Sequence, residues 1–363
     1  MQKEKILDKE WQQLAVSIKN TAPHLTTTKI AEMVSVPRTT LRDFFNRYFK
    51  ALLEQDNGSE YLYCNDETLD VGFPEINIFV DGEKDSGVVQ EVFKIETSNN
   101  SENLQYPTHF IIPDSQVKPD VNLSYLSWIG EYIVRKKPEV ITHLGDFADL
   151  PSLSSYDKGK KSAEGKRLNR DIESVIEGMR LLLTPLYNLQ QEEIAIYGKV
   201  LYKPRMIMLY GNHENRLTRH VEANPELDGF LNLDDLCYKD FGWETIPFLE
   251  PITLNGIAYC HYFPNEFTGK PLGGSALSML KTLGVSFVQG HKQTLDHAVR
   301  HLPTNGKQQH GLICGAAYSH NEDYKGMNNS HWRGCVVAHR VNDGAYDPLF
   351  VSLDYLEEEY GKS

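Results

Sequence analysis

The sequence predicts an α/β protein with a small helical head, because apolar runs typical of buried strands alternate with helical segments over most of the chain. Two of these runs carry the strongest signal. Residues 140–144 precede residues 145–149 (Gly-Asp-Phe-Ala-Asp), and residues 206–210 precede residues 211–214 (Gly-Asn-His-Glu). In α/β folds the carboxyl ends of strands carry the functional site. The two blocks therefore predict polar ligands at the carboxyl edge of a sheet.

The alternation can be followed from residue 106 to the carboxyl end. The expected elements are a strand at residues 109–112, a helix at 120–137, a strand at 140–144, a helix around 168–190, a strand at 206–210, a helix opening after Glu214, a strand at 257–260, a helix at 275–283, a strand at 285–288 and C-terminal hairpins, the last of them at 332–344. Parallel strands come first and antiparallel strands last. This order predicts two packed sheets with helices outside.

Composition limits the class of protein. The chain of 363 residues has the apolar and charged fractions of a globular protein, and its net charge of −13 argues against general affinity for nucleic acid. No apolar stretch is long enough to span a bilayer, so we expect no membrane partner. The five cysteines are never close-spaced as pairs, which favours a reducing cytoplasm over a disulfide framework.

The charge is spread unevenly, and this predicts three parts. Residues 1–50 hold nine Lys and Arg against five Asp and Glu, whereas residues 51–105 hold two against thirteen. We therefore divide the chain into a basic head at residues 1–52, an acidic connector or small β-unit at 53–105, and a catalytic domain at 106–363. No residue of the connector indicates a function.

The head carries the pattern of a helix-turn-helix, in which two short helices share a small core and are joined by a tight turn. The apolar positions are Ile30, Val34, Val36, Leu41 and Phe44. The second helix would project basic and hydroxylic side chains that can reach phosphates or base edges, namely Arg38, Thr39, Thr40 and Arg42. This predicts DNA binding. The alternative is a helical bundle that binds protein or caps the catalytic domain.

Five short motifs of the catalytic domain share a position after an expected strand. They are Asp114-Ser115-Gln116, residues 145–149, residues 211–214, the lone His261, and Gly290-His291-Lys292-Gln293. Together they resemble the motifs of the calcineurin-like metallophosphoesterases over about residues 107–355. The resemblance implies an α/β/β/α sandwich of two mixed sheets. It also implies a dinuclear metal site that hydrolyses phosphoesters.

The resemblance assigns a role to each motif residue. Asp146 would bridge two divalent ions. The first ion would be completed by Asp114, Gln116 and Gln293, and the second by Asn212, His261 and His291. His213 would face the scissile phosphate and either stabilise its charge or protonate the leaving oxygen, while Asp149 would hold the His213 ring.

Two positions depart from the family pattern, and both belong to the first ion. Gln116 and Gln293 stand where the family usually has His. A neutral amide oxygen suits Mn²⁺, or Mg²⁺, better than Zn²⁺. We therefore expect an altered two-metal site that favours Mn²⁺. The alternative is a first site that is weak or empty.

Basic residues near the motifs are candidates for substrate binding. Lys160 and Lys161 follow the second motif and could contact non-bridging phosphates of a long substrate, or belong to a solvated loop. Arg216 follows the third motif and could reach a substrate phosphate or form a structural ion pair.

The sequence thus predicts a metal-dependent phosphodiesterase or nuclease that acts on DNA delivered by the head. Two alternatives remain: a phosphomonoesterase acting on a phosphoprotein or nucleotide, and a non-catalytic DNA-binding protein with a degraded metal site. Family members with Gly-Asn-His-Glu followed by Arg and a late Trp-x-Gly hairpin are often phage-encoded. We therefore expect a cytoplasmic protein of a bacterial host cell, with a homodimer left open.

Overall fold

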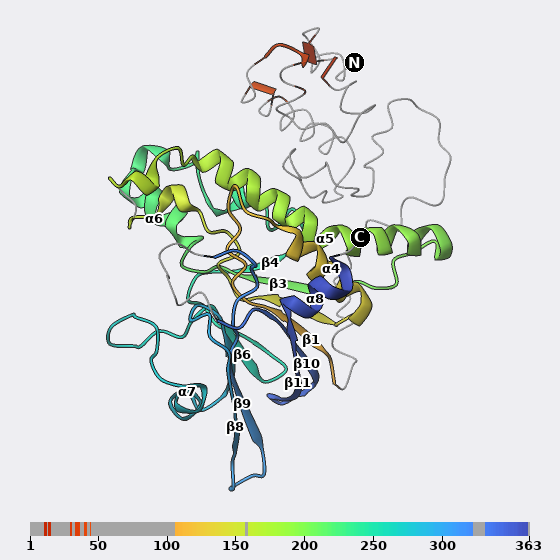
Figure 1. The fold of residues 1–363 in the computed structure, drawn as a ribbon, viewed down its shortest axis with the longest axis vertical. Coiled ribbons are helices and arrows are strands. Elements are labelled where there is room, and N and C mark those ends of the chain that lie inside the picture. The colour runs from red at the N-terminus through yellow and green to blue at the C-terminus, as the bar shows by residue number, and fades with distance from the viewer. Residues whose placement is uncertain are drawn as a thin grey trace, which may run out of the picture. The chain divides into compact units, whose positions relative to one another are not determined.

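The computed structural model describes residues 106–156, 159–321 and 331–361, together with residues 11, 12, 14, 15, 30, 33–36, 40, 41 and 44 near the amino terminus. The chain divides into two compact units, Met1–Ile95 and Glu96–Ser363 (Figure 1). The expected connector at residues 53–105 lies outside the described residues.

The first sheet of the larger unit has six strands in the order β11-β10-β1-β2-β3-β4. Its strands are β1 (His109–Ile112), β2 (Val140–His143), β3 (Arg205–Leu209), β4 (Glu244–Ile246), β10 (Gly334–Asn342) and β11 (Ala345–Ser352). Strands β1 to β4 are parallel, whereas β10 runs antiparallel to both β1 and β11. The sheet is therefore mixed, and its parallel strands all end at the same edge.

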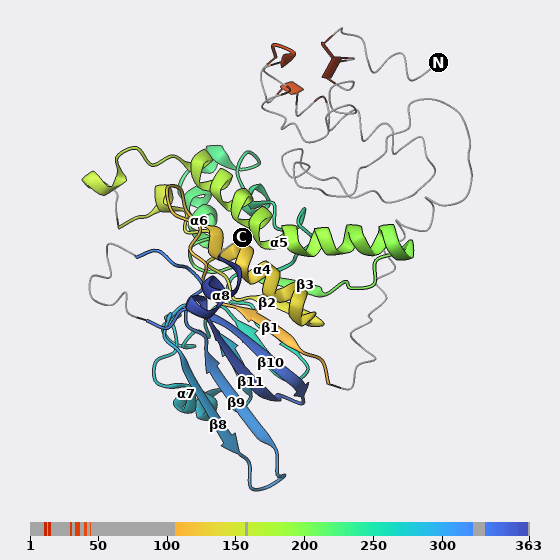
Figure 2. The same cartoon turned by 45° about the vertical axis from the view of Figure 1, so that its right-hand side comes forward.

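The second sheet has five strands in the order β5-β6-β7-β9-β8. Its strands are β5 (Ile252–Leu254), β6 (Ile257–Cys260), β7 (Ser286–Gln289), β8 (Asp296–His301) and β9 (Gln308–Ile313). Strands β6, β7 and β9 are parallel, and the outer strands β5 and β8 pair antiparallel with β6 and β9. The β8–β9 hairpin projects beyond the other strands, as Figure 2 shows.

The inner faces of the two sheets form one apolar core. Ile111 of β1 packs in the same cluster as Val288 of β7, and the cluster draws residues from both sheets. Because side chains alternate across a strand, Phe110 points to the opposite face, where its ring lies 6.1 Å from that of Tyr132 on α4. The alternation of residues 110 and 111 therefore separates a sheet–sheet core from a sheet–helix core.

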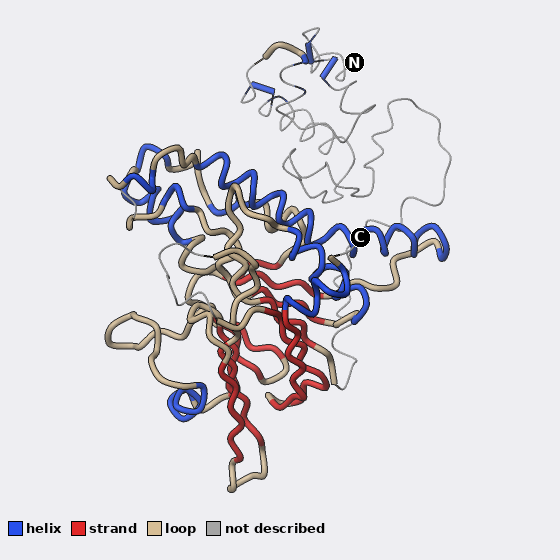
Figure 3. Tube along the Cα trace, in the orientation of Figure 1, coloured by secondary structure: helices blue, strands red, loops and turns tan. Residues whose placement is uncertain are grey.

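Helices lie outside the sheets. They are α4 (Ser124–Lys136), α5 (Leu168–Tyr197), α6 (Asn215–Ala223), α7 (Ala276–Leu283) and α8 (Leu353–Tyr360), with 3-10 turns η3 (Pro151–Leu153), η4 (Lys161–Ala163), η5 (Pro225–Leu227) and η6 (Leu233–Leu236). Helix α7 packs through Met279 and Leu280 on Phe287 of β7, on the outer face of the second sheet. Figure 3 shows the strands gathered together, with the long helix α5 along one side of them.

The predicted α/β class and the two mixed sheets are confirmed. The final hairpin is present as β10 and β11, joined at Asp343 and Gly344. Three elements were not predicted, namely β4, β5 and α8. The first two are three residues long, so their sequences are too short to show a period. Within the described ranges, no helix combines the length and apolar character needed to cross a bilayer.

In the amino-terminal unit, Ile30 and Met33 are helical, residues 34–36 form a turn, and Leu41 and Phe44 are helical again. The Val34 N–H donates to the Ile30 carbonyl at 2.9 Å. Ile30, Leu41 and Phe44 are buried. The predicted helix-turn-helix as a whole stays a prediction, because most of residues 1–52 lie outside the described ones.

Candidate metal centre

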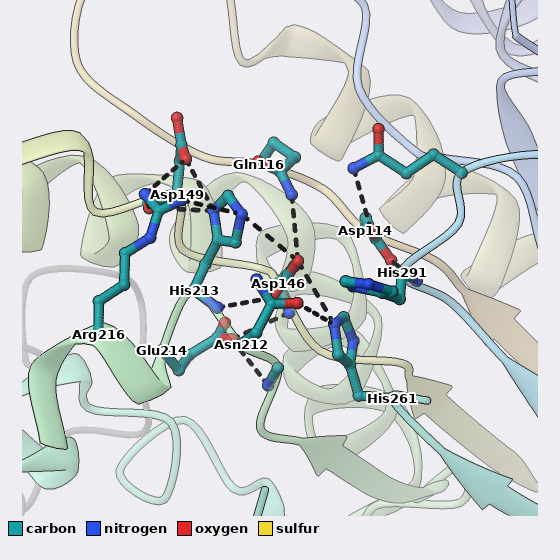
Figure 4. Close-up of polar contacts among 12 residues, drawn as sticks. Asp114, Gln116, Asp146, Asp149, Asn212, His213, Glu214, Arg216, His261 and His291 are labelled. Carbon is teal, nitrogen blue, oxygen red and sulfur yellow. Dashed lines mark hydrogen bonds and ion pairs between the residues drawn. The ribbon is translucent and has the colours of Figure 1, made fainter. Parts of the chain in front are cut away.

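The candidate site lies at the carboxyl ends of parallel strands from both sheets. Asp114 follows β1, Asp146 follows β2, Asn212 follows β3, His261 follows β6 and His291 follows β7. Figure 4 shows these side chains converging on one place. The five motifs, which are spread over about 180 residues of sequence, are therefore brought together in the fold.

Asp146 stands at the centre of the cluster. Its Oδ1 atom accepts the backbone N–H of His213 at 2.8 Å, and its Oδ2 atom lies 3.4 Å from Nε2 of His261. One ligand atom each from Asp146, His261 and His291 fall within 4.8 Å of one another. A buried carboxylate between two imidazoles is a donor set that transition metals bind readily.

The His261 ring is oriented for a cation. Its Nδ1 atom donates to the Leu144 carbonyl at 2.8 Å, which directs Nε2 toward Asp146. The Asn212 Oδ1 atom lies 3.0 Å from the same Nε2. Although burial lowers the pKa of His261, the Asp146 carboxylate outweighs it and raises the pKa to about 9. His261 Nε2, Asp146 Oδ2 and Asn212 Oδ1 thus converge on one position, so these residues fit a divalent ion.

The Asp114 side of the cluster is built differently. Asp114 accepts the His291 backbone N–H at 3.0 Å and the Gln293 side-chain amide Nε2 at 3.0 Å. The other end of that amide, Oε1, accepts the Tyr318 hydroxyl at 2.9 Å. Burial, together with the nearby Asp146 charge, raises the pKa of Asp114 to about 6. Gln293 therefore turns its nitrogen toward the carboxylates, and its oxygen is held by Tyr318.

Gln116 is the second departure from the family pattern. Its Nε2 atom lies 3.4 Å from Oδ2 of Asp146. Its Oε1 atom is buried and has no hydrogen-bond partner among the described residues. A buried acceptor without a partner is rare and calls for an explanation, such as an ion that is not part of the polypeptide. Gln116 therefore fits the first ion better than Gln293 does.

His213 lies beside the cluster and is held by two neighbours. Its Nδ1 atom lies 2.8 Å from Oδ1 of Asp149, the carboxylate expected to hold this ring. Its Nε2 atom lies 3.1 Å from Arg216 and 3.8 Å from Oδ2 of Asp146. Burial acts to lower the pKa of His213, but the carboxylates of Asp146 and Asp149 outweigh it and raise the pKa. The Nε2 edge of the ring thus faces the candidate ligands.

Arg216 has a positioning role in this arrangement. Its guanidinium donates to the Asp149 carbonyl at 2.7 Å and approaches Oδ1 of Asp149 at 3.4 Å. Of the two alternatives that the sequence left open, these contacts favour a structural pairing. The same arginine also lines a surface cavity next to Asn212.

Glu214 is the residue that the sequence reasoning left without a role. Its buried carboxylate accepts the backbone N–H groups of Asp146, Ala148 and Gly211 at 2.9–3.0 Å, and the Tyr238 hydroxyl at 3.1 Å. It therefore ties the loop after β2 to the loop after β3. Its place as the last residue of Gly-Asn-His-Glu was the available signal.

Glycines allow these two loops to touch. A Cβ atom on Gly211 would lie 2.1 Å from Oδ1 of Asp146, and one on Gly145 would lie 2.7 Å from the Gly211 nitrogen. Four ligand candidates, Gln116, Asp146, His291 and Gln293, have φ between 49° and 63°. Such left-handed conformations in non-glycine residues store strain and cluster at functional sites. The backbone is therefore bent to bring the side chains together.

Two of the predicted substrate-binding residues are not brought to the cluster. Lys160 and Lys161 are exposed at η4, and the described contacts of the cluster do not include them. Thr40 is exposed in the amino-terminal unit. Arg38, Thr39 and Arg42 lie outside the described residues.

Comparison with known proteins adds a distant relative. No protein-family model matches the chain. The chain is similar to the Gene 54 protein of Mycobacterium phage L5, with 24% identity over 186 residues that cover 50% of this chain and 67% of the phage protein. The name of that protein states no activity, so the similarity indicates a phage relative and leaves the function to the geometry of the site.

Proposed function

We propose that this protein is a metal-dependent phosphoester hydrolase of the calcineurin-like metallophosphoesterase type, acting as a phosphodiesterase on DNA. The observation that carries the proposal is the cluster of Asp146, His261 and His291, with His213 at its edge and Asp149 behind His213. Carboxylate, imidazole and amide ligands beside a histidine that can move a proton form a set suited to phosphoryl transfer.

The fold supports the same proposal. Two mixed sheets share one core, and helices pack on their outer faces. This is the layer order of the α/β/β/α sandwich that the sequence motifs imply. The ligands come from strands of both sheets, as a site at the common edge of such a sandwich requires.

The chemistry can be divided among the groups present. Bound divalent ions would activate a water molecule and neutralise charge on the phosphoryl oxygens. Asp146, Asn212, His261 and His291 would hold the ion that the geometry fits best. As the water oxygen adds to phosphorus and gives up a proton to solvent, the ester P–O bond breaks and His213, protonated at Nε2, would give that proton to the leaving oxygen. The products are a phosphomonoester and an alcohol.

We propose two metal sites of unequal strength. At the site around His261, the ring keeps its Nδ1 contact with the Leu144 carbonyl, and only the Nε2 contacts with Asn212 and Asp146 give way to the ion. The site around Asp114 needs the amides of Gln116 and Gln293 to turn their oxygens inward, and for Gln293 this breaks the contact with Tyr318. Because its ligands are oxygens, this weaker site would favour Mn²⁺ or Mg²⁺ over Zn²⁺.

DNA is the proposed substrate because of the head. Beyond residue 50 the chain carries 28 Lys and Arg against 45 Asp and Glu, so this part repels DNA as a whole. The basic head would supply the missing affinity through a helix-turn-helix. The similarity to a phage protein supports a place in the cytoplasm of a bacterial host.

The test is hydrolysis by metal-stripped protein refilled with Mn²⁺, Mg²⁺ or Zn²⁺. The substrates are bis(4-nitrophenyl) phosphate, a diester, and 4-nitrophenyl phosphate, a monoester. We expect the diester to be cleaved with Mn²⁺, Asp146→Ala to be inactive, and Asp228→Asn, which changes an exposed carboxylate, to behave as wild type. Cleavage of the monoester alone would move the proposal to a phosphomonoesterase, and cleavage of neither would leave a non-catalytic DNA-binding protein.

A further inference from the structure

A surface cavity of about 220 Å³ opens beside the metal cluster. It is lined by Ser155, Tyr156, Asn212, Asn215, Arg216, Arg219, Phe248 and Tyr262. Two features set this lining apart: three aromatic rings and two arginines face one small space. Asn212, one of the candidate ligands, belongs to the lining, so the cavity begins where the cluster ends.

The aromatic side of the cavity is continuous with the cluster. The Tyr262 ring lies 4.7 Å from the ring of His291, and the Phe248 ring lies 5.6 Å from Tyr262 and 6.3 Å from His261. Tyr262 and Phe248 are thus packed in place by the ligand histidines. Tyr156 is 78% exposed, so its ring remains available for contact with a ligand.

The opposite side of the cavity is basic. Arg216 and Arg219 lie one turn apart on α6, so both project to one side of the helix. Arg216 is anchored to Asp149, whereas Arg219 is exposed. A ligand that extends from the cluster would therefore meet an aromatic surface and, next to it, a guanidinium suited to a phosphate.

We propose that this cavity binds the nucleoside that flanks the scissile phosphate, with the base stacked on the aromatic rings and the next phosphate on Arg219. This inference rests on the proposed phosphodiesterase function and adds a site that binds the nucleoside of the substrate. A base that stacks on protein must first leave its neighbours in the duplex. The substrate at this site is therefore single-stranded DNA or an unpaired end.

The experiment compares two diesters that differ only in the group that the cavity would receive. They are thymidine 5′-(4-nitrophenyl phosphate) and methyl 4-nitrophenyl phosphate, both assayed with the full-length protein loaded with Mn²⁺. Because stacking of a single base contributes substantially to binding, we expect kcat/KM for the thymidine ester to be at least about tenfold higher. Equal values for the two esters would overturn the inference while leaving the hydrolase proposal intact.

Variants then test whether this cavity causes the preference for the thymidine ester. Tyr156→Ala should lower the ratio of the two kcat/KM values by about fivefold or more, because it removes a stacking ring. Arg219→Ala should leave the ratio unchanged, because neither ester carries the next phosphate. Tyr156→Phe should retain the ratio, because the ring remains. Tyr197→Ala removes an exposed tyrosine at the end of α5 and should also retain it. A ratio that is the same in Tyr156→Ala and wild type would contradict the assignment of this cavity.

A binding measurement separates the cavity from catalysis. Calorimetric titration of the Mn²⁺-loaded protein should show thymidine 5′-monophosphate binding at least about tenfold more tightly than inorganic phosphate. This difference would remain even if neither ester were hydrolysed, in which case the hydrolase proposal alone would fail. Equal affinities for the two ligands, or preference for a phosphotyrosine peptide over the nucleotide, would overturn the inference.

Discussion

The carboxylate of Glu214 accepts the backbone N–H of Asp146 at 2.9 Å, and this contact holds the central candidate ligand from behind. Asp146 itself has φ of 52°, a conformation that non-glycine residues rarely adopt. The strained backbone is kept in place because Glu214, on the neighbouring loop, fixes the N–H group on one side. The His213 N–H fixes the Asp146 side chain on the other.

We therefore predict that Glu214→Gln weakens both stability and metal binding. A Gln amide keeps only one acceptor oxygen, so the buried donors that bond to the other carboxylate oxygen of Glu214 lose their acceptor. This loss costs about 2 kcal/mol in the free energy of unfolding. Urea unfolding and calorimetric Mn²⁺ titration measure the two effects. Glu222→Gln, on the exposed face of α6, is the control. A Glu214→Gln protein that matches this control in both measurements would show that the contact is dispensable.

A variant of His213 should distinguish the loss of proton transfer from the loss of metal binding. We expect His213→Ala to lower kcat by roughly a hundredfold or more, in line with the contribution of a general acid, while Mn²⁺ binding is retained. Asp146→Ala should lose both activity and metal binding, because its carboxylate offers a ligand atom within 4.8 Å of those of His261 and His291. If calorimetry found that His213→Ala no longer binds metal, His213 would be a ligand and not an acid.

The parts of the site that the sequence predicted share a physical reason. Strands β2 and β3 are adjacent and parallel, so Asp146 and Asn212, which follow them, must come together. The same holds for His261 and His291 after β6 and β7. A strand followed by a glycine and a ligand can be predicted from sequence, because these residues are neighbours in the chain and the strand has its own apolar pattern.

The parts that could not be predicted depend on partners distant in sequence. The orientation of the Gln293 amide is set by Tyr318 and Asp114, and neither is a neighbour of Gln293 in the chain. The structural role of Arg216 likewise depends on Asp149, which lies 67 residues away. Residue identity indicates that such side chains can donate or accept, but only the fold decides which atom faces the site.

The amide orientations predict two classes of metal site. Mn²⁺ titration of the metal-free protein should show one tight site and one weaker site. Replacing both amides, Gln116→His with Gln293→His, should strengthen the weaker site and shift its preference toward Zn²⁺, because imidazole suits Zn²⁺ better than an amide oxygen does. The tight site should change little, which serves as the internal control. Two equal Mn²⁺ sites in the wild-type protein would contradict this prediction.

The head should be required for DNA and not for chemistry. Removal of residues 1–50, or the pair Arg38→Glu and Arg42→Glu, should abolish DNA binding in gel shifts and cleavage of long DNA. Hydrolysis of a small diester should persist, because the ligands lie in the other unit. Binding by the intact protein should also weaken steeply with salt, since phosphate contacts release counterions. DNA affinity that survives the truncation would make the head a protein-interaction module and favour the monoesterase alternative.

A buried histidine between the sheets predicts a pH dependence of stability. His109 contacts the Tyr259 hydroxyl at 2.7 Å and Asn255 at 3.0 Å, and burial lowers its pKa to about 4. Below its ordinary pKa near 6.5, the unfolded chain takes up a proton that the folded protein does not accept until about pH 4. Stability contributed by the neutral ring is therefore present above pH 6.5 and is lost progressively as the pH falls toward 4.

A difference of one bound proton changes the free energy of unfolding by about 1.4 kcal/mol per pH unit. Between pH 6.5 and about pH 4 the loss of stability is therefore on the order of 3 kcal/mol. His109→Gln in metal-free protein should reduce the slope of unfolding free energy against pH by about one proton, as measured by urea unfolding between pH 4.5 and 6.5. Tyr259→Phe is the matched control. It removes the hydroxyl contact and lowers stability, but it keeps the buried imidazole and should keep the slope. A His109→Gln protein with the wild-type slope would mean that His109 does not govern this acid sensitivity.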